Sequence, residues 1–114
     1  MEDCIFCKII HGIIPSNKVF EDEQVFAFRD IHPLAPTHIL IIPKKHYSSL
    51  EALSKVDQLL LGHLLSTATL ITHQENIAQD GYRVAINCGA WGGQVVQHLH
   101  IHLLGGRKLV DELG

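Results

Sequence analysis

The sequence predicts an α+β domain with a five-stranded, mainly antiparallel sheet. The expected elements follow one another as a short helix, three strands, a long helix and two strands, an order typical of this class. At 114 residues the chain is close to the usual size of one domain, so we expect 1–114 to fold as a single unit. Hydrophobic residues make up 46% of the chain, which is enough for a core without a disulfide framework.

Hydrophobic periodicity and turn residues place the elements along the chain. The expected strands are residues 18–21, 24–29, 37–43, 81–88 and 95–106. The expected helices are residues 3–12, which Asp3 can cap and Gly12 can end, and residues 55–78. Ser54 and Asp57 resemble a capping box at the start of the long helix. The apolar run at 37–43 is continuous, so we expect this strand in the middle of the sheet.

Charge and composition argue against several classes of protein. The net charge is −3 and no basic stripe is present, so we expect no nucleic-acid binding. No apolar run approaches the ~20 residues that a membrane span needs. Two acidic residues precede the first apolar stretch, whereas a secretory signal carries positive charge there. We therefore expect a cytoplasmic protein whose three cysteines form no structural disulfide.

Three histidines at alternate positions, His98, His100 and His102, are the most informative feature of the sequence. Alternate residues of a strand share a face, so the three imidazoles would lie on one side and the intervening apolar residues would enter the core. An imidazole row suits metal binding or nucleophilic and acid–base chemistry. Glycine pairs at 92–93 and 105–106 flank the row and favour a bound phosphate, because glycine lets backbone N–H groups approach an anion.

Cys4 and Cys7 form a C-x-x-C pair within the first expected helix. Such a pair is typical of a zinc site or a redox site. The redox interpretation needs a thioredoxin-like strand–helix context, which this sequence lacks. Zinc would need two further ligands, such as imidazoles, to complete a tetrahedron. The alternative is two free thiols on a helix.

The stretch from His98 to Leu104 (HLHIHLL) resembles the signature of the histidine triad (HIT) superfamily. The resemblance covers nearly the whole chain, and "FRDI", "APTH" and "LLGGR" are most similar to its nucleotide-binding phosphoramidase (Hint) branch. It implies the HIT-like fold and hydrolysis of purine nucleoside 5′-phosphoramidates at their P–N bond, and of related acyl or aminoacyl adenylates. No metal is needed for this chemistry in the family.

The resemblance also implies roles for individual residues. His100 would attack the α-phosphorus to form a nucleotidyl-histidine, which water then hydrolyses. His102 would donate to a phosphate oxygen, His38 would support the site and assist the leaving group, and His98 completes the triad. The implied substrate-binding residues are Asp30 for the ribose, Phe6, Ile9, Phe28 and Ile31 for the base, and Asn87, Gly93 and Gln94 for the phosphate or leaving group.

Two further expectations come from the resemblance. Some HIT proteins hold a structural zinc ion, and the matching residues here are Cys4, Cys7, His46 and His98. The family also implies a homodimer, paired through the long helix and the 81–88 strand into one continuous sheet.

Two alternative functions stay open. One is hydrolysis of dinucleoside polyphosphates, as in another HIT branch, although "LLGGR" favours the phosphoramidases. The other is a nucleotide-binding regulatory module with little catalysis. Val95 stands where many relatives carry a hydroxyl residue, and the tail after Arg107 is short; these two features keep the second alternative open.

Overall fold

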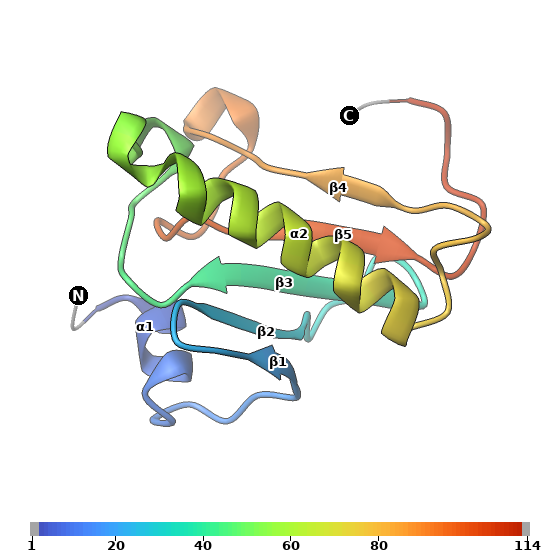
Figure 1. Cartoon of the computed structure of the whole chain (residues 1–114), viewed down its shortest axis with the longest axis horizontal. Coiled ribbons are helices and arrows are strands. Elements are labelled where there is room, and N and C mark those ends of the chain that lie inside the picture. Colours follow the sequence, from blue (N-terminus) through green and yellow to red (C-terminus); the bar gives the residue numbers. More distant parts are fainter. Residues whose placement is uncertain (1–2, 113–114) are drawn as a thin grey trace.

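Five antiparallel strands and one long helix make up the fold of this computed structural model, which describes residues 3–112. The strands are β1 (Lys18–Glu21), β2 (Val25–Arg29), β3 (Thr37–Pro43), β4 (Arg83–Ala85) and β5 (Ile101–Gly105). The α-helices are α1 (Ile5–Ile10) and α2 (Gln58–Gln74), and the short 3-10 turns are η1 (Leu50–Ala52), η2 (Lys55–Asp57) and η3 (Ala90–Gly92). The sheet has the order β1-β2-β3-β5-β4, and α2 crosses one of its faces (Figure 1). The predicted α+β class is confirmed.

The central strand β3 is buried along its whole length, as its continuous apolar run predicts. Alternate residues of β3 face two separate apolar clusters. Ile39 and Ile41 pack with Leu64 and Ala68 of α2 in the larger cluster. Leu40 packs on the opposite face, in the cluster that contains α1. The long helix α2 therefore covers one face of the sheet, and α1 packs on the other.

The last strand is shorter than the expected 95–106, because the residues before Ile101 find partners outside the ladder. The N–H of Leu99 donates to the carbonyl of Tyr47 at 2.7 Å, and the His98 ring lies 2.9 Å from the carbonyl of Pro43. Tyr47 follows β3 and Pro43 ends it, so His98 and Leu99 bond there instead of pairing in the ladder, and the chain bends at residues 96–98. Residues 81–88 likewise shorten to β4, which pairs only with β5.

Both helices are also shorter than expected. The N-cap of α1 is Cys4 and not Asp3, because the Cys4 sulfur accepts the Cys7 N–H at 3.3 Å. The predicted capping box of Ser54 and Asp57 is confirmed, but it begins a 3-10 turn before α2. The long helix ends early because Asn76 adopts a left-handed conformation (φ 58°). Within residues 3–112, no helix is long and apolar enough to span a membrane.

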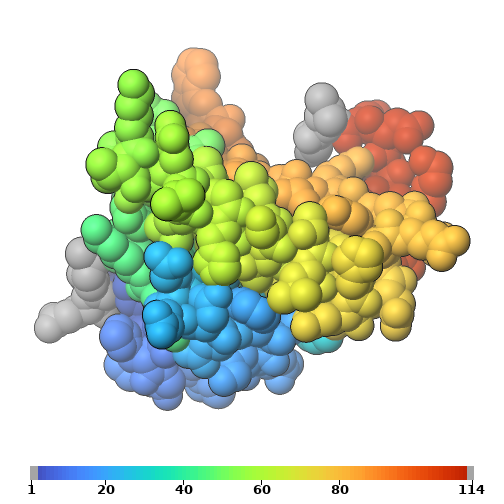
Figure 2. Space-filling view, viewed as in Figure 1, coloured from blue at the N-terminus to red at the C-terminus, as the bar shows by residue number. Residues whose placement is uncertain are grey.

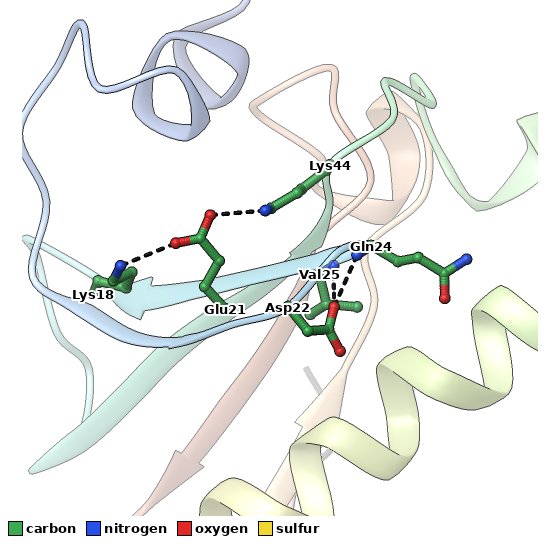
Figure 3. A network of polar contacts seen from close by, with 6 residues as sticks. All are labelled: Lys18, Glu21, Asp22, Gln24, Val25 and Lys44. Atoms are coloured by element: carbon green, nitrogen blue, oxygen red, sulfur yellow. Dashed lines mark hydrogen bonds and ion pairs between the residues drawn. The ribbon is translucent and has the colours of Figure 1, made fainter.

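The turn between β1 and β2 is fastened by two acidic residues (Figure 3). Glu21 bridges Lys18 and Lys44 at 2.9 and 2.7 Å. Asp22 accepts the N–H groups of Gln24 and Val25, both at 2.8 Å, which lowers the pKa of its carboxyl against the opposing effect of burial. This turn holds the start of β2 in place, and Asp30 follows directly after the other end of that strand.

Replacing Gly105 by alanine is expected to destabilise the protein by about 1–3 kcal/mol, because overpacking a filled core forces its neighbours to move. An added methyl group would lie 2.7 Å from Cδ1 and 3.3 Å from Cβ of Ile77. Urea unfolding would measure the loss. The matched control is Gly62→Ala in α2, where nothing lies within 4 Å and a gain of about 0.5–1 kcal/mol is expected. Equal stability of the Gly105 variant and the parent would contradict this packing account.

Candidate active site and metal centre

The alternating histidines occupy one face of the extended segment that ends in β5. Between them, Leu99 and Ile101 enter the core beneath α2, as predicted. Only His102 belongs to the hydrogen-bonded strand; His98 and His100 precede it. The rings of His100 and His102 are neighbours, with centroids 5.0 Å apart.

The structure determines which ring nitrogen of His100 carries the hydrogen. Its Nδ1 lies 2.7 Å from the carbonyl oxygen of His98, and a carbonyl can only accept. Nδ1 therefore carries the hydrogen, and in the neutral ring Nε2 carries the free lone pair. The imidazole is 6% exposed and meets the edge of Phe6 at a centroid distance of 5.2 Å. Such a buried, oriented imidazole is a suitable nucleophile.

His102 contacts His38, and His38 in turn lies beside Asp30. His38 Nε2 is 3.0 Å from His102 Nδ1 and 3.5 Å from an Asp30 carboxylate oxygen. The other ring nitrogen of His38 accepts the N–H of Leu34 at 3.1 Å. The sequence could not indicate this last contact, because it comes from the backbone of a loop and not from a recognisable side chain.

Burial keeps these imidazoles neutral. It lowers the pKa of His102 to about 4, and the neighbouring His100 and His38 add to this effect. Burial also lowers the pKa of His38, with Asp30 opposing. A neutral ring donates from one nitrogen and accepts at the other, which is what a directed hydrogen-bond network requires.

Stability is expected to fall as the pH drops from 6.5 towards 4. The unfolded chain binds a proton at a histidine of ordinary pKa, while the folded chain binds it at His102 only near pH 4. This contribution is fully present above pH 6.5 and is lost as the pH falls. Urea unfolding at several pH values tests this. A His102→Gln variant should lose stability less steeply in the same window, and an unchanged slope would contradict the assignment.

An apolar surface of α1 and β2 borders the histidine face. Phe6 and Phe28 are buried and stack edge to face at a centroid distance of 5.5 Å, with Ile9 packed beside them. Ile31 does not join them, because its side chain is 83% exposed in the loop after β2. Three of the four residues expected around a base are therefore together.

The loop at 89–94 is held by the two amide side chains expected near a phosphate. Asn87 Nδ2 donates to the carbonyl of Gly92 at 2.7 Å. Gln94 is buried, donates to the carbonyls of Ser48 and Val96, and accepts the N–H of Gly89 at 2.9 Å. The side chains of Asn87 and Gln94 therefore hold the backbone of the 89–94 loop in its conformation.

Four metal-ligating side chains converge at the N-terminus of α1. Their ligand atoms all lie within 4.8 Å of one another, and they belong to Cys4, Cys7, His46 and His98. His98 Nδ1 is 3.3 Å from the Cys4 sulfur and 3.1 Å from His46 Nδ1, and His46 Nδ1 is 3.4 Å from the Cys7 sulfur. Ligands ~2.0–2.3 Å from a zinc ion lie about 3.3–3.8 Å apart in a tetrahedron, so the set fits zinc.

The tautomer of His98 also suits a metal ligand. Its Nε2 lies 2.9 Å from the carbonyl of Pro43 and must carry the hydrogen, so the Nδ1 lone pair points at the two sulfurs. Histidines that ligate a metal typically donate their other ring N–H to a carbonyl or carboxylate, which fixes the tautomer and the orientation of the ring. Burial raises the pKa of the Cys7 thiol to about 11, and Cys4 contributes.

Comparison with known proteins agrees with this geometry. The chain matches the HIT domain over residues 11–109. It is 50% identical to the purine nucleoside phosphoramidase of Escherichia coli, over 95% of this chain and 91% of that one. It is 54% identical to a 14 kDa zinc-binding protein of Zea mays, over 92% and 83% of the two chains.

A solved structure shows the same fold. The HIT family hydrolase of Legionella pneumophila superimposes with a TM-score of 0.96 and 46% identity, covering 98% of this chain and 100% of that one. The fold and the histidine row thus define a histidine triad protein. This chain belongs to the HIT family.

Proposed function

We propose that the protein is a purine nucleoside phosphoramidase that cleaves the P–N bond of nucleoside 5′-phosphoramidates through a nucleotidyl-histidine. The observation that carries the proposal is the bond from His100 Nδ1 to the His98 carbonyl, which leaves Nε2 of this buried imidazole as the nitrogen available to attack. The name of the Escherichia coli relative and the hydrolase fold of the Legionella protein support the same reaction class.

In the proposed reaction, His100 Nε2 attacks the α-phosphorus in line. A P–Nε2 bond forms, the P–N bond of the substrate breaks, and the amine leaves once its nitrogen has taken up a proton. Water then attacks the same phosphorus, releases the imidazole and returns a proton, which gives the nucleoside monophosphate. Negative charge builds on the phosphate oxygens, so a hydrogen bond from His102 Nε2 would stabilise the transition state.

The remaining residues would bind the nucleotide. The Asp30 carboxylate can accept the ribose hydroxyls. One of its oxygens already accepts the His32 N–H at 2.8 Å, but the Asp30 side chain is still partly exposed and a carboxylate can accept further hydrogen bonds. Phe6, Ile9 and Phe28 would contact the base. Gly93, in a left-handed conformation (φ 82°), leaves the backbone of the 89–94 loop open to a phosphate.

A zinc ion held by Cys4, Cys7, His46 and His98 would stabilise the fold and take no part in the chemistry. Zinc would favour the thiolate form of both cysteines and cross-link α1 to the segments before η1 and β5. The donor set of two sulfurs and two imidazoles supports zinc over magnesium or calcium, which prefer oxygen ligands.

A homodimer would cover the free edge of β4. This short strand pairs on one side only, and the edge is hollowed between the 89–94 loop and the C-terminal segment (Figure 2). Large apolar side chains of η2, of α2 and of the segment just before β4 are exposed: Val56 and Leu59 are each 89% exposed, and Tyr82 is 38% exposed. A second copy could extend the sheet and bury these groups.

Steady-state assays with adenosine 5′-phosphoramidate and diadenosine polyphosphate test the proposal. The account predicts AMP release from the phosphoramidate at a much higher kcat/KM. Faster cleavage of the dinucleotide would favour the polyphosphate hydrolases. AMP binding without turnover of either compound would leave a nucleotide-binding module.

A further inference from the structure

The loop at 30–36 and the segment after β5 meet at one end of the sheet, beside the histidine face. Thr37 opposes Gly105 in the β3–β5 ladder, so the start of β3 and the end of β5 lie together (Figure 1). A methyl group on Gly106 would lie 2.9 Å from Pro36 Cβ. Next along the chain, Arg107 Nη2 donates to the carbonyl of Leu34 at 2.8 Å.

Leu34 links this surface contact to the buried histidines. Its carbonyl is held by Arg107, and its N–H donates to His38 Nδ1 at 3.1 Å. An amide nitrogen can only donate, so His38 Nδ1 must be unprotonated and Nε2 must carry the hydrogen. The proton of His38 is therefore set by the backbone of the loop.

The tautomer of His102 follows from that of His38. Since His38 Nε2 carries the hydrogen, it donates to His102 Nδ1 across 3.0 Å. His102 then carries its own hydrogen on Nε2, away from His38. One backbone amide thus determines the direction of two successive hydrogen bonds, and the last donor in the series is His102 Nε2–H.

This direction also explains why the cluster of Asp30, His38 and His102 is unsuitable for a metal, although their ligand atoms lie within 4.8 Å of one another. A metal on His38 Nε2 would displace the hydrogen to Nδ1. That hydrogen would face the Leu34 N–H, which is itself a donor. The arrangement favours a proton-ordered chain over a cation.

We propose that Arg107 is a positioning residue of the active site. It anchors the 30–36 loop through the Leu34 carbonyl, which keeps the Leu34 N–H in place to donate to His38. His38 then stays in its Nε2–H tautomer and donates to His102. His102 in turn stays in its own Nε2–H tautomer and donates to the phosphate. The catalytic part of this inference rests on the proposed phosphoramidase function; the tautomer part rests on the geometry alone.

Long-range ¹H–¹⁵N spectra of the imidazoles test the tautomers directly, and a set of variants tests Arg107. In the parent, both His38 and His102 should be protonated at Nε2. Arg107→Ala should introduce Nδ1–H tautomer at both rings and lower kcat for adenosine 5′-phosphoramidate by about tenfold, since a small misplacement from a remote change is costly. The AMP dissociation constant should rise by a smaller factor than kcat falls, because the hydrogen bond from His102 gains strength as negative charge builds on the phosphate oxygens in the transition state.

Arg107→Lys keeps a cationic donor and should recover part of both effects. Lys108→Ala is the matched control, because the exposed Lys108 side chain pairs with Asp111 at 3.1 Å and leaves the Arg107–Leu34 bond untouched. Unchanged tautomers in Arg107→Ala, or altered tautomers with parental kcat, would overturn the proposal. If the parent turned over no phosphoramidate, the proposed function would fail, while the spectra would still decide whether Arg107 sets the tautomers.

Discussion

Replacing His100 by alanine is expected to lower kcat for adenosine 5′-phosphoramidate by at least about 10⁴-fold, since a lost nucleophile leaves only binding and electrostatic stabilisation. No neighbouring imidazole can take its place. His98 Nδ1 faces the two cysteine sulfurs, and His102 Nδ1 faces His38. Following AMP release under single-turnover conditions would measure the loss.

Binding separates this prediction from simple unfolding. The His100→Ala variant should still bind AMP within severalfold of the parent, because Asp30, Phe6 and Phe28 are unchanged. His73→Ala, on the exposed side of α2, is the matched control and should turn over at the parental rate. A His100 variant that keeps a substantial rate while folded would show that the nucleophile lies elsewhere.

Replacing Cys7 by serine is expected to weaken zinc binding by at least about 100-fold, since the loss of a group that only hydrogen-bonds a ligand already costs about 10–100-fold in metal affinity. The thermal midpoint should fall as well, because metal binding to the folded state alone contributes directly to stability. Competition with a chromogenic chelator would measure the affinity, and scanning calorimetry with and without chelator would measure the stability.

Cys88→Ser is the matched control, because Cys88 lies outside the four-residue cluster. It should keep one zinc ion per chain and the parental midpoint. A Cys7→Ser variant that binds zinc as tightly as the parent would refute the assigned ligand set. In the proposed zinc site His98 would ligate through its ring while its carbonyl holds His100, so zinc removal is also expected to reduce turnover.

The parts of the fold that sequence predicts well are those encoded by short-range pattern. The alternation at 98–103 correctly assigns imidazoles to one face and apolar side chains to the other. The apolar run at 37–43 correctly identifies the central strand. Both patterns reflect the two-residue period of a strand, which depends only on the local backbone.

Element ends and partner choices depended on distant residues and were predicted less well. The strand expected at 95–106 begins only at Ile101, because the backbone of Tyr47 takes the Leu99 N–H. His63 of α2 pairs with Asp22, 41 positions away, at 2.6 Å, a contact that no local pattern in the sequence indicates. Ile31 is 83% exposed in the loop after β2, and its contact with the base stays a prediction.

The candidate site, like the fold, could be predicted from the sequence only in part. The metal-ligand set and the histidine row could be named from the sequence through a family resemblance, and the structure brings the four ligands together. The carbonyls of His98 and Pro43 and the amide of Leu34 could not be predicted, because every residue carries these groups. Those backbone atoms decide which nitrogen of each imidazole is free.

Trapping the covalent intermediate tests the central claim most directly. The protein would be mixed with adenosine 5′-phosphoramidate, quenched within milliseconds in alkaline denaturant, which preserves a phosphorus–nitrogen bond to histidine, and analysed by intact and peptide mass spectrometry. The account predicts one adenylate per chain, located on His100. An adduct on another residue, or AMP release with no adduct at any quench time, would contradict it.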